Sequence, residues 1–218
     1  MKKRKNIITV AIDSPAAAGA GTQAKLIAKE YKLLYLDTGK IYRKIGYLRL
    51  IKNKKFNTLL VKKQMNKIKL EDLNDKKLLS DKVALSAAII ARDKEIRKIV
   101  KRFQLNCAFN PPKKFAGSVL DGRDITSVLM KNAMFKFYIT ANLKTRAKRR
   151  YIEYKKLKKK ISFKEVLKSI ENRDNLDKNR KYSPLKKTQD SILINTTKIS
   201  KKACFLKIKN IMDKKINI

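Results

Sequence analysis

The hydrophobic and polar positions of the chain form short apolar runs that alternate with longer amphipathic stretches. The run IITVAI at 7–12 is apolar and rich in β-branched residues, which predicts a buried parallel strand. A loop of small residues, DSPAAAGAGT, follows it, and QAKLIAKEY then predicts a helix. A short strand or turn, LLYLDTG, leads into a predicted helix over about 40–51.

The rest of the chain continues this alternation. Residues 53–110 have a helical, lysine-rich pattern that the motif NPP interrupts. FAGSVLDGRDI and KFYITA predict two further strands, and a basic helix is expected over about 143–158. A helix at about 163–172, a polar turn, a last strand in SILINTT and a last helix at about 200–215 complete the pattern. Strands that alternate with helices predict an α/β fold around a mostly parallel sheet.

The composition excludes several kinds of chemistry. The chain has no histidine, which rules out Ser-His-Asp and Cys-His nucleophiles and every histidine-containing metal site. Cys107 and Cys204 are far apart and have no C-x-x-C spacing, so neither a disulfide framework nor a zinc site is expected. No apolar stretch has the length of a membrane helix. We therefore expect a cytoplasmic protein.

The net charge of +39 comes from 57 lysine and arginine residues against 18 acidic ones. The lysines are spread over nearly all predicted helices, so solvated surfaces explain them more simply than a selected polyanion-binding surface does. Arginine is more informative, because its planar guanidinium can bind phosphate through two hydrogen bonds. Several arginines fall in or near the motifs described below, which indicates phosphate recognition.

The loop after the first strand has the position and the small residues of a phosphate-binding loop. Such loops surround phosphates with backbone N–H groups at the positive end of the following helix. Two features of the usual G-x-x-x-x-G-K-[ST] pattern are missing, because Ser14 replaces the first glycine and Ala20 replaces the lysine. Taken alone, the loop fits an ordinary alanine-rich strand–turn–helix equally well.

Four further segments carry candidate chemistry, in the order LYLDTGKIYR, LDGRDI, TRAKRRYIEY and RDNLDKNRKYSPLKK. The second of these ends a predicted strand at the carboxyl edge of the sheet, where α/β folds bind ligands. Arg146, Arg149 and Arg150 lie at i, i+3 and i+4 and share one helix face. The alternative interpretations are a helix N-cap with a surface arginine for the first segment, a strand-end salt bridge for the second, and a solvated charged face for the last two.

Together and in this order, the segments resemble the bacterial cytidylate kinase family, whose motifs read GPxGSGKGT, YLDTGAMYR, xDGRDIGTVV, ERAxRRY and RDxxDxxRxxxPL. The resemblance extends from Ile7 to about the last helix. It implies a P-loop nucleoside monophosphate kinase fold with a five-stranded, mostly parallel sheet. It also implies three parts, which are a core kinase domain, an insert that binds the nucleoside monophosphate, and a lid. The core would comprise 1–52, 111–158 and 191–218, the insert 53–110, and the lid 159–190.

The resemblance implies transfer of the ATP γ-phosphoryl group to CMP or dCMP, with ATP and Mg²⁺ as cofactors and without a metal site made by the protein itself. The implied catalytic residues are Arg123, Arg173, Asp177 and Arg180. The implied ATP-binding residues are Ser14, Pro15, Ala16, Ala17, Ala18, Gly19, Ala20, Gly21, Thr22 and Arg149. The implied substrate-binding residues are Asp37, Thr38, Arg43, Arg97, Asp121, Arg123 and Asp177. Asp121 would read the cytosine amino edge, and Asp177 would hold the acceptor ribose.

The main departure from the family pattern is Ala20. Losing one charge-assisted hydrogen bond costs roughly 1.5–3 kcal/mol, which corresponds to about a 10- to 150-fold loss of rate. Lys25 and Lys40 are candidates to reach the site instead. The alternative is a catalytically weak or inactive kinase fold that binds nucleotides or RNA.

The substrate-binding insert departs from the family as well. A family arginine is missing near Leu78 and Leu79, and the family serine falls on Ala88. These differences leave the preference among CMP, dCMP and UMP open, and a kinase for another monophosphate is a further alternative that the D-G-R-D motif disfavours. We expect a monomer that takes CMP or dCMP, does not bind membranes, and binds nucleic acid only non-specifically through its charge.

Overall fold

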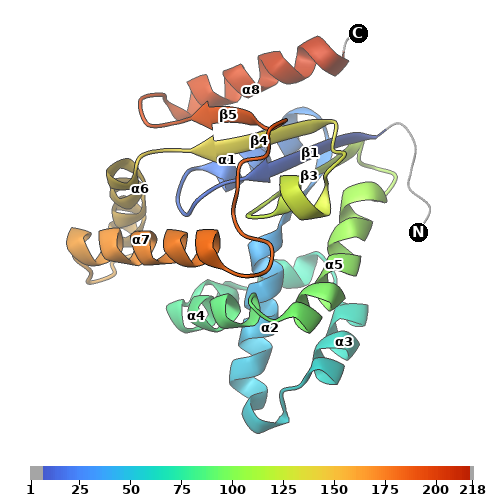
Figure 1. Cartoon of the computed structure of the whole chain (residues 1–218), viewed down its shortest axis with the longest axis vertical. Coiled ribbons are helices and arrows are strands. Elements are labelled where there is room, and N and C mark those ends of the chain that lie inside the picture. Colours follow the sequence, from blue (N-terminus) through green and yellow to red (C-terminus); the bar gives the residue numbers. More distant parts are fainter. Residues whose placement is uncertain (1–6, 217–218) are drawn as a thin grey trace.

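A computed structural model describes residues 7–216, apart from the side chain of Asp81. Its five strands form one parallel sheet in the order β2-β3-β1-β4-β5 (Figure 1), which confirms the predicted α/β class. The outer ends of the predicted core, 1–6 and 217–218, lie outside the described residues. The strands are β1 (Ile8–Asp13), β2 (Leu33–Asp37), β3 (Gly117–Gly122), β4 (Phe135–Thr140) and β5 (Ile192–Asn195).

Helices cover both faces of the sheet. One face packs against α1 and α8, and the other against α2 and α5. Successive residues of β1 alternate between the two clusters, with Val10 and Ile12 on the first face and Ala11 on the second, as expected for a strand buried on both sides. The helices are α1 (Ala20–Glu30), α2 (Thr38–Lys52), α3 (Thr58–Lys67), α4 (Asp81–Ile90), α5 (Lys94–Phe109), α6 (Leu143–Lys156), α7 (Phe163–Asn179) and α8 (Lys201–Ile216). No helix within the described range is long and apolar enough to cross a membrane.

The predicted insert at 53–110 contains α3, α4 and α5, with short 3₁₀ turns before α3 and between α3 and α4. Gly46 of α2 allows α4 to pack unusually close, because a Cβ at this position would lie 2.7 Å from the backbone nitrogen of Ala87. The Ser86 hydroxyl of α4 also donates to the Gly46 carbonyl at 3.0 Å. These contacts fix α4 beside α2, and both helices form one wall of the cleft described below.

The helix expected at 163–172 is longer in the structure, where α7 extends to Asn179. A capping box between Ser162 and Glu165 starts it. Its last turns carry few apolar side chains, so hydrophobic periodicity does not mark them. A buried ion pair of Asp174 and a partly buried one of Asp177 stabilise these turns instead, and Arg180 is the C-cap of the helix.

The five residues after the D-G-R-D motif form a π-helix, Ile125–Leu129, which the sequence pattern does not indicate. The carboxylate of Asp13, at the end of β1, accepts hydrogen bonds from the backbone of Ile125 and Thr126 at 2.8 Å each, and from the Thr126 hydroxyl at 2.6 Å. Asp13 is fully buried, and burial raises its pKa to about 6 in spite of these hydrogen bonds. The end of the central strand is thereby joined to the segment that follows D-G-R-D.

Candidate active site

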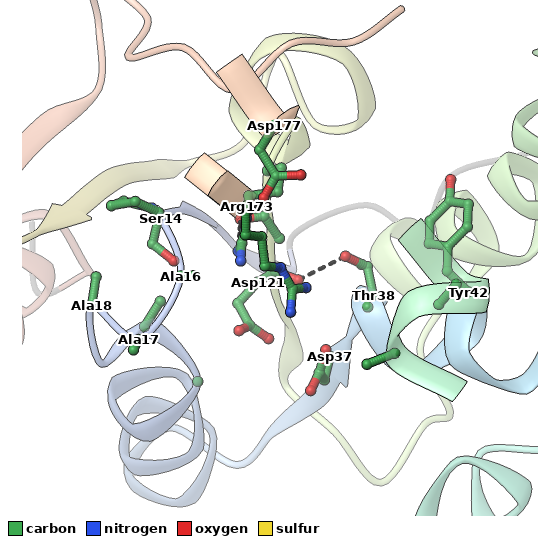
Figure 2. Close-up of a pocket in the computed structure, with 18 of the residues that line it drawn as sticks. Ser14, Ala16, Ala17, Ala18, Asp37, Thr38, Tyr42, Asp121, Arg173 and Asp177 are labelled. Atoms are coloured by element: carbon green, nitrogen blue, oxygen red, sulfur yellow. Dashed lines mark hydrogen bonds and ion pairs between the residues drawn. The ribbon is translucent and has the colours of Figure 1, made fainter. Parts of the chain in front are cut away.

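A cleft of about 590 Å³ opens at the carboxyl ends of β1, β2 and β3. All the ATP-binding, substrate-binding and catalytic residues named from the sequence line this one cleft, although they come from segments spread over most of the chain. Figure 2 shows the loop residues Ala16, Ala17 and Ala18 on one side, with Arg173 and Asp177 entering from α7. The topology explains this, because loops that follow parallel strands all emerge at the same edge of the sheet.

Sequence reasoning did not single out several other residues that line the cleft, namely Tyr35, Ala84, Ala87, Ala91, Glu153 and Leu176. The alanines could have been found, because with Ala88 they recur at helical spacing along α4. A helix face made only of small side chains leaves room for a flat ligand to approach it. Ala88, where the family serine was expected, lies in this wall.

The phosphate loop adopts two left-handed backbone conformations. Gly19 has φ +93° and precedes α1, whose first N–H groups, from Ala20 to Thr22, have no partner within the helix. Ala17 has φ +58°, at a position where the family motif has glycine. A Cβ in this region costs about 1–2 kcal/mol, so Ala17 is a third departure from the motif, which sequence reasoning missed.

Asp37 and Asp121 lie opposite one another at the ends of neighbouring strands. Burial is the main cause that raises the pKa of Asp121 to about 7, and the negative charge of Asp37 is the second. The Tyr35 hydroxyl and the positive charges of Arg123 and Lys25 oppose this shift. Oδ1 of Asp121 is buried and has no hydrogen-bond partner among the described residues. A carboxylate with a free buried oxygen, beside a second carboxylate, is suited to a hydrated cation.

A second group of charges lies towards the insert. Arg97 donates to Asp124 at 2.5 Å, and Arg180 lies 3.7 Å from the other oxygen of Asp124. Arg123 donates to Asp177 at 2.7 Å, and Arg180 lies 3.8 Å from Asp177. Burial opposes the charge on Arg123, but the carboxylates of Asp177, Asp121 and Asp174 together outweigh it and raise the pKa of the guanidinium. The arginine–carboxylate network across the cleft thus consists of Arg97, Arg123, Asp124, Asp177 and Arg180.

Arg173 differs from the arginines of this network. It extends from α7 into the cleft (Figure 2) and has no ion pair with the other described residues. Loss of solvation is the main cause that lowers the pKa of Arg173 to about 10, and the positive charge of Arg123 is the second. Arg173 is therefore still fully charged near neutral pH. An unpaired guanidinium that meets another positive charge favours an anion between the two.

The other sequence candidates take different places. Arg43 donates to the backbone carbonyl of Leu78 at 2.9 Å, in the segment where the second family arginine is missing. Arg149 binds the hydroxyl and the carbonyl of Thr196 at 2.9 and 2.6 Å, beside the phosphate loop. Lys25 lines the cleft, whereas Lys40 does not and donates to Asn74 instead.

The three arginines of α6 that share one face in the sequence also separate. Arg149 and Arg150 line the cleft, but Arg146 is buried behind the phosphate loop, 2.6 Å from Asp174. The helix face is therefore not a simple phosphate-binding stripe, because its first arginine serves another purpose.

A central parallel strand, a small-residue loop at a helix N-terminus and a cleft rich in arginine define a P-loop nucleoside monophosphate kinase. The family model for cytidylate kinase matches residues 10–214, and the chain belongs to this family.

Relatives of known name support the same assignment. The chain is 40% identical over 207 residues to the cytidylate kinase of Clostridium tetani, with 87% of each chain covered. It is 41% identical over 200 residues to the cytidylate kinase of Bartonella tribocorum, with 90% of each covered. Among solved structures, an uncharacterized protein from Eubacterium ventriosum superposes with a TM-score of 0.54 and 16% identity, over 94% of this chain and 98% of that one. This likeness concerns the fold alone.

Proposed function

We propose that this chain is a cytidylate kinase that transfers the γ-phosphoryl group of ATP to CMP or dCMP, giving ADP and CDP or dCDP. The observation that carries this proposal is that all the catalytic, ATP-binding and substrate-binding residues inferred from the resemblance line a single cleft. Chemistry of this kind requires positioning and neutralisation of charge rather than a covalent intermediate. It therefore needs neither histidine nor a nucleophilic cysteine.

The donor nucleotide would bind at the phosphate loop. Backbone N–H groups of the loop and the first turn of α1 are suited to bind the ATP phosphates without any side chain. Arg149, fixed by Thr196, adds a positive charge beside the loop. Because this part of the site depends on the backbone, the substitutions Ser14 and Ala17 are compatible with phosphate binding.

Mg²⁺ fits beside Asp37 and Asp121. Among the described residues no group of three acidic or thiol side chains could hold a metal on its own. The free buried oxygen of Asp121 and its neighbour Asp37 could instead accept hydrogen bonds from water molecules on the ion. When bound there, Mg²⁺ would neutralise negative charge on the donor phosphates.

For the acceptor base, the geometry favours Asp124 over Asp121. Asp121 lies against the phosphate loop, because a Cβ on Gly21 would be 3.3 Å from its Oδ2. Asp124 lies instead with Arg97, on the side of the cleft that α4 borders. A carboxylate accepts a hydrogen bond from the cytosine amino group. Asp124 would therefore read the base, and Asp121 would act on the phosphate side, through the hydrated Mg²⁺.

The transfer itself would take place between Arg123 and Arg173. Arg173 enters from α7, and a phosphoryl group between these two guanidinium groups would relieve their repulsion. Arg180 would neutralise charge on the acceptor side, and Asp177 would hold the ribose. Arginines of this kind typically contribute about 10³- to 10⁵-fold to phosphoryl transfer.

We assign the core to 1–52, 111–158 and 191–218, the substrate-binding insert to 53–110 and the lid to 159–190. The proposed lid contains α7, which carries both Arg173 and Asp177. A lid of this kind excludes water when it closes, and so directs the phosphoryl group to the nucleotide. We further propose a cytoplasmic monomer, with only non-specific, salt-sensitive binding to nucleic acid.

Lys25 would compensate in part for the missing lysine at position 20. It is the only lysine among the described residues that lines the cleft, and its charge reaches Asp121. Side chains of a helix point towards its N-terminus, so the ammonium group of Lys25 is directed towards the phosphate loop. This placement supports an active enzyme over the alternative of an inactive nucleotide- or RNA-binding protein.

The proposal is tested by measuring ADP release from Mg-ATP with CMP, dCMP, UMP, AMP or no acceptor, using Arg173→Ala as a negative control. We expect ADP release above background with CMP and dCMP only. Release with UMP or AMP alone would contradict the assigned substrate. No acceptor-dependent release from folded protein would contradict the kinase and favour the inactive alternative.

A further inference from the structure

The phosphate loop is bound from behind by two charged residues that do not line the cleft. The backbone N–H of Ala16 donates to Oδ1 of Asp174 at 3.1 Å, and the Ala16 carbonyl accepts from Nη1 of Arg146 at 3.0 Å. Arg146 and Asp174 also contact each other at 2.6 Å. Both polar groups of one loop residue are thus fixed by a single ion pair.

This contact is a built feature of the interior. The side chains of Arg146 and Asp174 are each only 7% exposed, and Nε of Arg146 donates to the Ala141 carbonyl at 2.9 Å. The Ala16 side chain packs in an apolar cluster with Val166 and Ile170 of α7. A buried pair with this many hydrogen bonds has little freedom to adopt another geometry.

The ion pair connects the loop to the residues of the opposite wall. Asp174 follows Arg173 in the chain and precedes Asp177 by one helical turn, and both neighbours line the cleft. Arg146 precedes Arg149 by one turn of α6. A displacement of Ala16 therefore moves α6 and α7 together with the arginines that they carry.

We propose that Arg146 and Asp174 are positioning residues for phosphoryl transfer, because they hold the phosphate loop and the cleft arginines of α6 and α7 in one fixed arrangement. The inference rests on the proposed function. It gives the pair a particular importance in this chain, whose loop lacks the lysine at position 20 and carries Ala17 in a left-handed conformation. A loop with these departures depends on support from outside itself.

The main test replaces both charges together, as Arg146→Met with Asp174→Leu, so that neither charge is left buried alone. We expect kcat with CMP to fall about 100-fold, because a misplacement of about 1 Å can have this effect. The affinity for ADP, measured by calorimetry, should fall about tenfold. KM for CMP should change less than about threefold, because the acceptor site lies elsewhere in the cleft. A kcat within threefold of the natural chain would overturn the proposal.

A matched control separates positioning from general stability. Ser118→Ala removes another buried hydrogen bond, from the Ser118 hydroxyl to the Ala108 carbonyl at 2.6 Å, away from the cleft. It should lower Tm but leave kcat unchanged. If it lowers kcat as much as the double variant does, the pair has a purely structural role and the proposal is wrong.

The single variant Asp174→Asn decides the question if the double variant does not fold. Its amide oxygen can still accept from Ala16, but its charge is lost, and we expect kcat to fall about tenfold; a change under threefold overturns the proposal. If the natural chain transfers phosphate to none of the acceptors, the proposed function fails. The positioning role is then tested by comparing the ADP affinity of the variants with that of the natural chain. A tenfold loss of ADP affinity in the variants still supports the positioning role, whereas an unchanged affinity contradicts it.

Discussion

The phosphate loop and the arginine–carboxylate network are two parts of one cleft that differ in how closely they follow the family motifs. The loop has serine, alanine and alanine where the motif has glycine, glycine and lysine. The network keeps Arg123, Asp124, Asp177 and Arg180, and all of them are paired across segments distant in the chain. Backbone N–H groups tolerate changes of side chain, whereas a planar guanidinium–carboxylate pair has no substitute.

The largest effect should come from Arg173, which lies beside the network in the same cleft but is not paired with any of its residues. Arg173→Ala should lower kcat at least about 10³-fold with little change of Tm, because its guanidinium has no ion pair in the described structure and is free for the transferred group. Arg173→Lys keeps the charge but not the planar fork, and should recover only part of the loss. Steady-state kinetics with CMP tests both. Equal activity of the lysine variant would show that charge alone suffices.

The next largest effect should come from Lys25, and it tests whether this residue compensates for the lysine that the loop lacks at position 20. Lys25→Gln in the natural background should lower kcat/KM about 10- to 150-fold, which corresponds to the loss of one charge-assisted hydrogen bond. In an Ala20→Lys background the same change should cost less than about threefold, because the restored lysine takes over. Lys29→Gln, one turn further along α1, serves as the control. Equal costs in both backgrounds would refute compensation by Lys25.

A smaller effect is expected from Asp124, and it tests whether this residue, rather than Asp121, reads the acceptor base. Asp124→Asn should lower kcat/KM for CMP about tenfold and narrow the preference for CMP over UMP, because an amide accepts less strongly from the cytosine amino group. The comparison of CMP with UMP as acceptors tests this. An unchanged ratio of the two substrates would indicate that Asp124 does not read the base.

The free energy of unfolding should depend on pH through two carboxylic acids of the interior, Asp121 and Asp13, whose pKa values are raised. In the folded chain the pKa of Asp121 is about 7 and that of Asp13 about 6, above the ordinary value of 3.8. Between about pH 4 and 7 the folded state therefore binds more protons than the unfolded state, and the free energy of unfolding falls as the pH rises.

Without nucleotide and Mg²⁺, Tm should thus decrease from about pH 5 to about pH 7.5. Asp121→Asn should flatten this decrease, and Ser118→Ala should leave its slope unchanged. Thermal unfolding followed by circular dichroism tests both variants. A Tm that rises over this interval would contradict the assigned direction of the shifts.

The smallest effect concerns the backbone of the loop. Ala17→Gly removes a Cβ from a left-handed position and gives the unfolded chain more freedom, so the two contributions partly cancel. We expect Tm to rise by about 1–3 °C and kcat to stay within about twofold. Ala18→Gly, whose φ is not positive, should lower Tm instead. A large change of kcat in Ala17→Gly would mean that the loop geometry is less robust than proposed.

Sequence reasoning found the sheet, the helices and the residues of the cleft because these depend on local patterns and on motif order. It ended α7 too early because the last turns are stabilised by Asp174 and Asp177, whose partners lie far away in the chain. It also grouped Arg146 with Arg149, although only the tertiary structure determines that one supports Ala16 and the other lines the cleft. Helical spacing predicts a shared face but not which neighbour each side chain meets.

The central position of β1 has a consequence for the synthesis of the protein. Val10 pairs with Val119 on one side and Phe135 on the other, so β1 is synthesised more than a hundred residues before its partner strands emerge. During this time an apolar strand edge is open to other nascent chains, which is the usual route to aggregation. The lysines and arginines already present in such a chain, a part of the surplus behind the net charge of +39, make it repel its neighbours. We therefore expect the lysine surplus to limit aggregation of the unfinished chain, a benefit that requires no ligand for the finished one.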